Sequence, residues 1–378
     1  QIARRLLQEY RPEGKFELVF DPYMGSGTTL VEAKIIGIRS IGTDINPLAQ
    51  FITKSKITNF DINKITNARL LLIEAMSNYI PNFDFTLENV TNWEFWYDKN
   101  KVSELLFLTH EISKLESKIQ DFFKISLSEC VREVSFTRNN EFKRYKMSHK
   151  KLETFNPDTF RLFINKIDRN LIGLQALNNV NSDDIASVCS FNSVVEIPSD
   201  IIIDGSVDMV VTSPPYGDSR TTVAYGQFSR WANEWFNFDN AKSLDSILMG
   251  GRKINKYSFE TDLLTDSLTL IKNQDQKRYH EVLDFLEEYY LSMKNVAQKV
   301  RSGGRVCYVV GNRTVKGVQI SLDYFTVETF ERLGFKELVT YVRDIPNKRM
   351  PSVTSPTNVK GNHVNTMSNE FIVILEKQ

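Results

Sequence analysis

Two short stretches of the 378-residue chain carry residue types from which a ligand site could be built. The first reads Asp21-Pro-Tyr-Met-Gly-Ser-Gly-Thr-Thr29 and follows an apolar segment. Its closely spaced glycines allow strained backbone dihedrals and the close approach of a ligand, and the helix that starts after them presents N–H groups to an anion. Asp21 suits a cationic amine instead. These demands together describe the carboxylate and ammonium of an amino acid better than a diphosphate.

Other interpretations of this glycine turn were weighed against the sequence. A P-loop needs Gly-Lys-Ser/Thr, which is absent, and a dinucleotide fingerprint needs a third glycine where Leu30 stands. A tight turn without a ligand is the alternative for two glycines alone. Asp44 ends the next predicted strand, where a ribose diol is commonly bound. The two acids at the ends of neighbouring predicted strands, together with the two glycines of the turn, therefore favour a nucleoside-type cofactor.

The second stretch, Thr212-Ser-Pro-Pro-Tyr216, follows the apolar segment 207–211, which has the composition of a buried strand. Ligands in open α/β sheets bind at the carboxyl ends of strands, so this stretch is placed for substrate contact. Successive prolines leave rigid carbonyl acceptors, and Tyr216 supplies a stacking face. With the Ser213 hydroxyl, the set suits a flat heterocycle that bears an exocyclic NH₂. A Pro-Pro loop without such a role is the alternative.

The elements that must position these motifs alternate between strand and helix. Helical spacing of apolar residues is seen over 2–10, 28–36 and 325–333, and in a helix that begins near residue 279 and ends before residue 302. Strands are predicted at 16–20, 39–43, 185–189, 207–211, 305–310, 335–342 and 371–375. This order predicts an α/β fold with a doubly wound, mostly parallel, seven-stranded Rossmann-like sheet.

The region 58–180 loses this alternation and has helical spacing, with a helix capped by Asp61 and further helices over 101–123 and 158–177. We expect residues 1–57 and 181–378 to form one domain. The residues 58–180 would be a helical insertion, and 237–278 a smaller insertion.

Composition and charge exclude several classes of protein. Lys plus Arg (47) equals Asp plus Glu (47), so the formal net charge is zero. A protein that coats a polyanion by means of its overall positive charge is therefore not expected. The three cysteines lie far apart and the four histidines are scattered, so no disulfide scaffold or metal site is expected. No run of about 18 apolar residues exists to span a membrane. We expect a cytoplasmic protein, with further residues upstream because the chain begins with Gln1 rather than Met.

The pair of motifs resembles that of the amino-DNA methyltransferases, which methylate the exocyclic amine of cytosine or adenine with S-adenosylmethionine. In that family the first motif holds the cofactor, and the second, (Asp/Asn/Ser)-Pro-Pro-(Tyr/Phe), is catalytic. The resemblance implies a methyltransferase sheet and a prokaryotic or phage-type protein. The implied catalytic residues are Ser213, Pro214, Pro215 and Tyr216. The implied cofactor residues are Asp21, Tyr23, Gly25, Ser26, Gly27, Thr28, Thr29, Asp44, Ile45 and Asn192.

The Ser form of the tetrad is found mostly in N4-cytosine enzymes, so the resemblance implies sequence-specific methylation of cytosine N4 in duplex DNA. Base flipping and direct in-line transfer would follow, in a restriction–modification or similar defence system with a cognate endonuclease or other defence partner. N6-adenine methylation is one alternative, and a partner-dependent or non-catalytic DNA-binding subunit is another. The order of the motifs, cofactor before tetrad, is the reverse of many N4-cytosine enzymes. The family's Phe-x-Pro segment would fall upstream of Gln1.

The resemblance makes 1–57 and 181–378 the catalytic domain and the insertion 58–180 the candidate region for DNA binding or target recognition. Basic residues gather in two segments that could face DNA. Within 132–153 they outnumber acids seven to three and interleave with aromatics, which suits phosphate contact and base stacking. A solvated helical face is the alternative. The loop 217–230 is expected to close over a flipped base. The candidate DNA-binding residues are Arg138, Lys143, Arg144 and Lys146 in the first segment, and Lys348 and Arg349 in the loop 344–361.

Overall fold

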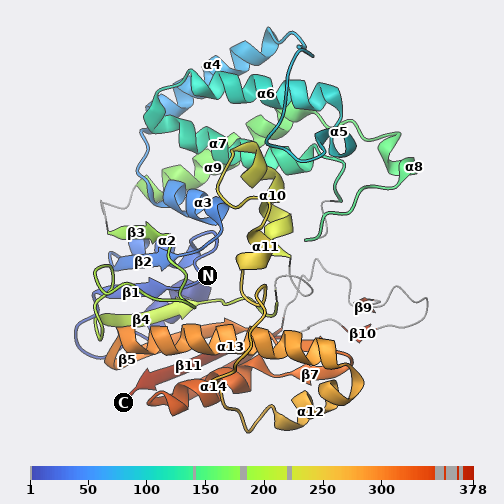
Figure 1. The fold of residues 1–378 in the computed structure, drawn as a ribbon. Helices are drawn as coiled ribbons and strands as arrows, with labels where there is room; N and C mark the ends of the chain where they lie inside the picture. The colour runs from blue at the N-terminus through green and yellow to red at the C-terminus, as the bar shows by residue number, and fades with distance from the viewer. Residues whose placement is uncertain are drawn as a thin grey trace. The chain divides into compact units, whose positions relative to one another are not determined.

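The computed structural model describes residues 2–138, 142–178, 185–218, 224–344, 353–354, 364–365 and 369–378. The chain divides into two compact units, drawn in Figure 1. The sheet unit comprises Gln1–Gln50, Asp184–Ala224 and Leu244–Gln378, and the helical unit comprises Phe51–Asp183 and Tyr225–Ser243. The predicted insertion 58–180 falls within the helical unit. The structure adds 225–243 to that unit, whereas the sequence had placed 225–236 in the catalytic domain and 237–243 in the smaller insertion 237–278.

A seven-stranded sheet with the order β3-β2-β1-β4-β5-β11-β8 forms the centre of the sheet unit. Strand β11 is antiparallel to both its neighbours, and the other pairs are parallel. The prediction of a doubly wound, mostly parallel sheet is confirmed. The strands are β1 (Leu18–Asp21), β2 (Arg39–Thr43), β3 (Ala186–Cys189), β4 (Val207–Thr212), β5 (Val300–Val310), β8 (Phe335–Asp344) and β11 (Asn369–Lys377).

From β1, the strands β2 and β3 are added on one side of the sheet, and β4 and β5 are added on the other side. The carboxyl ends of β1 and β4 therefore flank a topological switch point, where ligands bind in open α/β sheets. Two small antiparallel pairs accompany the main sheet. These are β6 (Arg313–Val315) with β7 (Val318–Ile320), and β9 (Val353–Thr354) with β10 (Val364–Asn365).

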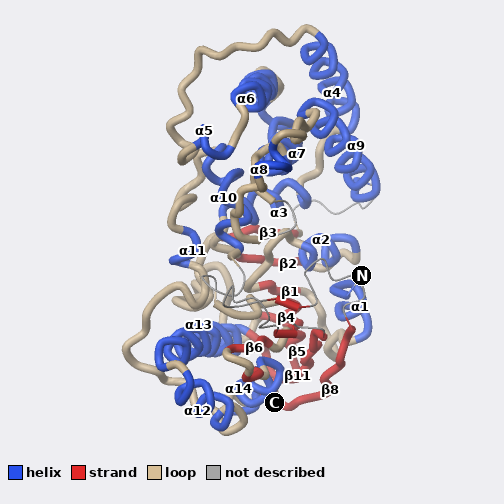
Figure 2. The backbone as a smooth tube through the Cα atoms, turned by 90° about the vertical axis from the view of Figure 1, so that its right-hand side faces the viewer, coloured by secondary structure: helices blue, strands red, loops and turns tan. Residues whose placement is uncertain are grey.

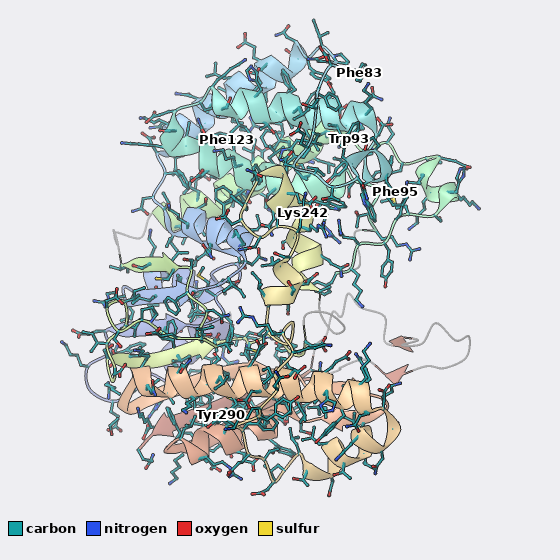
Figure 3. All side chains as sticks on the ribbon, viewed as in Figure 1. Phe83, Trp93, Phe95, Phe123, Lys242 and Tyr290 are labelled. Carbon is teal, nitrogen blue, oxygen red and sulfur yellow. The ribbon has the colours of Figure 1, made fainter. Side chains whose placement is uncertain are left out.

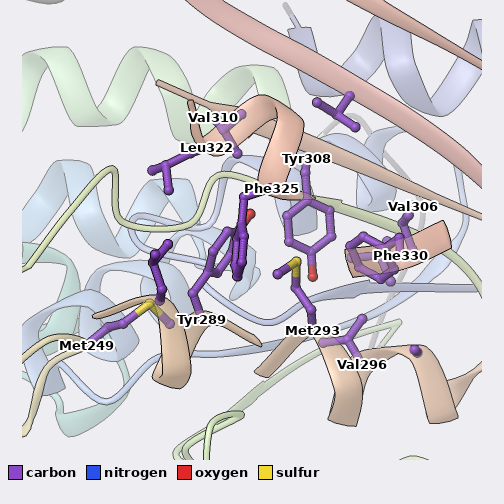
Figure 4. Packing of buried hydrophobic residues seen from close by; sticks show 14 of the residues in the cluster. Met249, Tyr289, Met293, Val296, Val306, Tyr308, Val310, Leu322, Phe325 and Phe330 are labelled. Carbon is purple, nitrogen blue, oxygen red and sulfur yellow. The ribbon is translucent and has the colours of Figure 1, made fainter. Parts of the chain in front are cut away.

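Helices cover both faces of the sheet because successive strand residues point to opposite sides (Figure 2). On one face, α1 (Ile2–Glu9) and α2 (Thr28–Ile35) share a core with Val19 and Cys307. On the other face, α13 (Gln276–Lys299) and α14 (Leu322–Arg332) pack around Phe20 and Tyr308. Figure 4 shows the second core, in which each fully buried large side chain stabilises the fold by about 1.5–3 kcal/mol.

Shorter helices complete the sheet unit, namely α11 (Leu244–Ile247) and α12 (Thr265–Gln274). Helix α3 (Pro47–Ile57) begins in the sheet unit and ends in the helical unit. The helical unit contains α4 (Ile62–Ser77), α5 (Trp93–Trp96), α6 (Lys99–Ser113), α7 (Ser117–Glu133), α8 (His149–Leu152), α9 (Thr159–Asn178) and α10 (Tyr225–Trp235).

Two sequence predictions about the helical unit have different outcomes. Asp61 caps α4 as predicted, since its carboxylate accepts hydrogen bonds from the N–H groups of Asn63 and Lys64. The single helix predicted over 101–123 is wrong, because the chain breaks into α6 and α7. The amide of Gln120 donates to the carbonyls of Ser113 and Leu115, which satisfies acceptors at the end of α6. Apolar spacing continues across the break and therefore hides it.

Candidate functional site

The glycine turn between β1 and α2 has the backbone that its sequence predicts. Gly25 (φ 49°) and Gly27 (φ 78°) both adopt left-handed dihedrals that favour glycine. Gly27 is the N-cap of α2 and has no side chain, so the first-turn N–H groups lack a side-chain cap. Ser26 and Thr28 are exposed on this turn. The turn therefore presents helix N–H groups where the sequence expects a ligand carboxylate.

Gly42 of β2 supports this turn and was missed in the sequence. A Cβ at Gly42 would lie 2.7 Å from Leu30 Cδ1 and 2.8 Å from Met24 Sδ. The Met24 N–H donates to the carbonyl of Thr43 at 3.0 Å, which ties the turn to β2. A glycine within a strand is the available signal, because it marks a close approach of other atoms.

Asp21 joins the two motifs. Its Oδ1 accepts hydrogen bonds from Thr212 Oγ1 (2.6 Å) and from the Tyr23 N–H (3.1 Å). Thr29 of α2 also donates to the carbonyl of Val211, at 3.0 Å. Burial raises the pKa of Asp21 to about 6, although its hydrogen bonds oppose that shift. The carboxylate thus lies at the carboxyl ends of β1 and β4 and directly contacts the residue that precedes Ser213.

Asp44 holds the other side of the glycine turn. Its two carboxylate oxygens accept from the N–H groups of Gly25 (3.0 Å) and Asn46 (2.8 Å). Burial raises its pKa to about 6, against the effect of these hydrogen bonds. Ile45, which follows it, is half-buried. Asp44 therefore lies where the sequence expects a ribose contact, and it also fixes the turn itself.

The loop after β3 is held by side chains on two neighbouring elements. Thr43 Oγ1 donates to the carbonyl of Phe191 at 2.5 Å. Ser193 and Ser292 share a hydrogen bond of 2.9 Å, and Tyr23 donates its hydroxyl to Ser292. Burial raises the pKa of Tyr23. The ordered hydroxyls connect the cofactor motif to α13.

Asn192, the predicted contact for an adenine amine, lies in this loop. Its Oδ1 accepts a hydrogen bond from the Val194 N–H at 3.0 Å. This is the local turn bond that asparagine commonly makes with backbone two residues on. An amide oxygen has two lone pairs, so Asn192 Oδ1 can still accept a hydrogen bond from an amine.

The tetrad leaves β4 with Ser213 exposed, Pro214 buried and Pro215 half-buried. Ser213 Oγ lies 3.1 Å from Tyr216 Oη, which donates to Glu370 Oε1 at 3.1 Å. A phenol has one hydrogen, and Tyr216 gives it to Glu370. Ser213 is consequently the donor to Tyr216, and the lone pairs of its oxygen point away from that bond.

Glu370 and Arg343 were missed in the sequence. Glu370 Oε2 pairs with Arg343 Nη1 at 2.9 Å, which orients the carboxylate that receives the Tyr216 hydroxyl. Glu370 lies on β11 and Arg343 on β8, more than 120 residues after the tetrad. No local spacing connects either residue with Ser213, so only strand pairing reveals them.

The residues after the tetrad are anchored by a buried ion pair. Asp218 Oδ2 accepts from Arg313 Nη1 at 2.7 Å, and both side chains are almost fully buried. The Arg313 guanidinium also lies 5.1 Å from the ring centroid of Phe285, and burial lowers its pKa. The predicted lid 217–230 is described only in part, because 219–223 lie outside the described residues.

The candidate DNA-binding residues of the first basic segment lie in the helical unit. A bridge between Thr137 and Lys146 pairs two described segments, 136–138 and 142–147, which we name the hairpin; residues 139–141 between them lie outside the described ranges. The Arg144 guanidinium lies 4.5 Å from the ring centroid of Trp231. Lys146 Nζ lies 3.9 Å from that of Phe95, which Figure 3 labels. Both cations therefore cover aromatic rings.

The remaining DNA-binding candidates have different settings. Arg138 is exposed on the hairpin and Lys143 is half-buried. Lys348 and Arg349 lie outside the described residues.

Across the described ranges, no helix is long and apolar enough to cross a membrane. The same part of the chain holds no group of three His, Cys, Asp or Glu side chains suited to a metal ion.

Comparisons with known proteins agree with these motifs. A family model described as DNA methylase, N6_N4_Mtase, matches residues 1–55. The chain is 37% identical over 403 residues to the type II methyltransferase M.MvaI of Kocuria varians, covering 100% of this chain and 88% of that protein. It is 24% identical to the type II methyltransferase M.BsoBI of Geobacillus stearothermophilus, covering 90% and 77%. The solved rRNA methyltransferase aviRa of Streptomyces viridochromogenes aligns with 11% identity and a TM-score of 0.32, covering 98% and 83%.

The buried ion pair yields a stability prediction. The substitution Asp218→Asn should lower the free energy of unfolding by about 3–5 kcal/mol, because it removes the carboxylate that pairs with the buried Arg313 guanidinium. Urea denaturation followed by circular dichroism measures this change. Asp262→Asn is the matched control, since Asp262 pairs with Arg332 at 2.8 Å but is 91% exposed. The control should cost under about 1 kcal/mol, and equal costs for both variants would contradict the prediction.

Proposed function

We propose that the target atom of this enzyme is N4 of cytosine. The chain belongs to the amino-DNA methyltransferase family, and it is an S-adenosylmethionine-dependent type II DNA methyltransferase. The observation that carries this proposal is the exposed Ser213 hydroxyl, whose hydrogen is directed to Tyr216 while its lone pairs remain for an amine. Serine at this tetrad position is the form that the family resemblance connects with cytosine N4. The enzyme would modify one duplex sequence in a restriction–modification system with a cognate endonuclease.

The residues of the glycine turn fit the cofactor. S-adenosylmethionine supplies an electrophilic methyl group on a sulfonium centre. Asp21 would hold its ammonium, and the first-turn N–H groups at Thr28 and Thr29 its carboxylate. Asp44 would accept from the ribose diol, with Ile45 against the adenine. The fit is supported by the buried carboxylate of Asp21 and the half-buried carboxylate of Asp44, whose raised pKa values a cationic ligand would bring down.

The remaining cofactor candidates act at the edges of this site. Tyr23 would position the turn through its hydroxyl bond to α13, and Gly25, Ser26 and Gly27 would shape the backbone around the ligand. Asn192 would contact the adenine amine through its amide oxygen, which accepts the Val194 N–H and has a second lone pair for the ligand.

The tetrad would activate the target amine by accepting its hydrogens. Ser213 Oγ and the Pro214 carbonyl would each accept one N–H, which frees the nitrogen lone pair from the ring. Tyr216 would stack on the flipped base, with its ring orientation fixed by Glu370 and, through that carboxylate, by Arg343. Positioning of this kind can contribute several kcal/mol to lowering the barrier.

The same side chains offer the amine proton a path. The proton would pass to Ser213 Oγ as serine passes its own hydrogen to Tyr216 and tyrosine passes its hydrogen to Glu370. The carboxylate of Glu370 would then carry the proton and release it to solvent. Serine alone is a weak base, so the path depends on the two residues behind it.

Contacts to DNA in the helical unit would come from the hairpin 136–147. Arg138 and Lys143 are its candidates for phosphate contact, and the exposed ring of Tyr145 lies beside the Arg138 guanidinium (5.9 Å). Arg144 and Lys146 would contribute by holding the hairpin against the rings that they cover. Lys348 and Arg349 remain candidates from the sequence.

The identity of the product tests the proposed function. Incubation of unmethylated DNA with labelled S-adenosylmethionine, digestion to nucleosides and mass analysis should give N4-methylcytosine. Ser213→Ala should bind DNA as the wild type does but methylate it orders of magnitude more slowly, because one acceptor for the amine is lost. N6-methyladenine as the product would overturn the base assignment. Full activity of Ser213→Ala would overturn the role of serine.

Two substitutions separate the parts of the hydrogen-bonded chain. Tyr216→Phe keeps the stacking ring but removes the hydroxyl, and Glu370→Gln keeps an acceptor for that hydroxyl but removes the base. Each should lower kcat by roughly 10²–10³-fold with little change in the KM for DNA, because general base catalysis contributes about that much. Glu370→Gln should also alter the acid limb of the pH–rate profile. A wild-type profile and kcat in Glu370→Gln would show that the carboxylate takes no part.

Cofactor affinity should depend on pH through Asp21 and Asp44. With folded pKa values of about 6, both carboxyls are largely protonated at pH 5 and ionised at pH 7. A cationic ligand favours the ionised forms, so affinity should fall roughly tenfold per pH unit below 6 for each required carboxylate, and binding near pH 6 should release protons.

Isothermal titration in two buffers of different ionisation enthalpy measures this proton release. Asp44→Asn, which can still accept from the Gly25 N–H, should bind S-adenosylmethionine more weakly and with a shallower pH dependence. A constant affinity between pH 5 and pH 7 in the wild type would contradict the assignment of these carboxylates.

A further inference from the structure

A short basic loop lies in the sheet unit between α11 and α12. The residues 250–258, which we name the basic loop, read Gly-Gly-Arg-Lys-Ile-Asn-Lys-Tyr-Ser. Arg252, Lys253 and Lys256 are exposed. Among the residues that the structure describes, none of the three has a carboxylate within 4.0 Å. The loop therefore presents three cations to solvent without an ion-pair partner in that part of the chain.

Buried carboxylates on α13 hold the backbone of the basic loop. Glu288 accepts from the Gly250 N–H at 2.5 Å, and Asp284 accepts from the Ile254 N–H at 3.1 Å. Glu287 accepts from the Ser258 N–H at 2.7 Å. The three acids are spaced to share one face of α13 and are each less than a tenth exposed. The acids thus face inward toward main-chain donors, while the loop's own cations face outward.

The loop begins next to the catalytic tetrad. Gly250 has φ 74°, and a Cβ there would lie 2.5 Å from Asp218 Cβ and 2.7 Å from its Cα. Asp218 is two residues beyond Tyr216 and is fixed by its ion pair with Arg313. Met249, directly before the loop, is buried in the core that Figure 4 shows. The start of the basic loop is therefore packed against the continuation of the tetrad.

We propose that the basic loop binds backbone phosphates of the DNA strand that carries the target base. This inference rests on the proposed function, in that it takes DNA as the substrate. A flipped nucleotide brings its flanking phosphates with it. The cations of a loop whose first residue packs against Asp218, two residues beyond Tyr216, match those phosphates in charge. Phosphate contacts position DNA without reading its sequence, so Arg252, Lys253 and Lys256 serve placement of the strand.

Neutralising the three cations tests the proposal. The triple variant Arg252→Gln, Lys253→Gln, Lys256→Gln leaves the main-chain bonds to α13 in place. Each lost phosphate contact should reduce the slope of log Kd against log salt by about 0.9, so the slope should become shallower by about 2–3. The KM for DNA should rise at least tenfold, while kcat at saturating DNA stays within about twofold of the wild type.

A matched control has the same charge change at the opposite edge of the sheet. Arg39 begins β2, Lys336 lies at the start of β8, and Lys294 lies near the end of α13 that leads into β5. All three are exposed. The variant Arg39→Gln, Lys294→Gln, Lys336→Gln should keep the wild-type salt slope and KM. Circular dichroism and S-adenosylmethionine binding should be unchanged in both triple variants.

The outcomes separate this inference from the proposed function. A basic-loop variant with the slope of the wild type overturns the inference, as does an equal loss of slope in the control variant. The product assay on the wild-type protein decides the proposed function independently. If the wild type binds DNA but forms no N4-methylcytosine, the proposed function fails while a selective loss of slope still supports the loop. If the wild type binds no DNA, both fail.

Discussion

The hydrogen bond from Thr212 to Asp21 connects two motifs that lie 191 residues apart in the chain. It exists because β1 and β4 are adjacent and parallel, so their carboxyl ends meet at one edge of the sheet. Asp21 orients the start of the glycine turn, and Thr212 orients the start of the tetrad. Every other feature of the site, from the Asp44 bonds to the Ser213 hydroxyl, is arranged around that shared edge.

The net charge of this protein does not describe how its acidic and basic side chains are distributed. The net charge is zero, yet the acids of α13 are buried and bonded to main-chain donors while the cations above them are exposed. A neutral chain can present a basic surface at this loop because the three neighbouring acids of α13 lie in the interior as hydrogen-bond acceptors.

Much of the sheet unit could be predicted from the sequence, because strand composition, turn glycines and helix caps are local properties. The strand that ends in Asp21 and the strands that precede Asp44 and Ser213 lie where the sequence predicts them. Glu370 could not be found this way, since its connection to Tyr216 depends on β11 pairing with β5. The helix break after Ser113 was hidden because apolar spacing continues through it. The role of Gly250 depends on its contact with Asp218, which is likewise non-local.

Strand β11 follows every other strand of the sheet in the chain, yet it lies between β5 and β8 and carries Glu370. During translation, β5 and β8 are synthesised before β11, the strand that lies between them. Until β11 has been made, each of the two strands therefore has an unpaired edge. The nascent protein can hold the glycine turn and the tetrad on adjacent strands and still lack the carboxylate behind Tyr216. The carboxylate that accepts the Tyr216 hydroxyl is therefore added to the site only after every other strand of the sheet has been made.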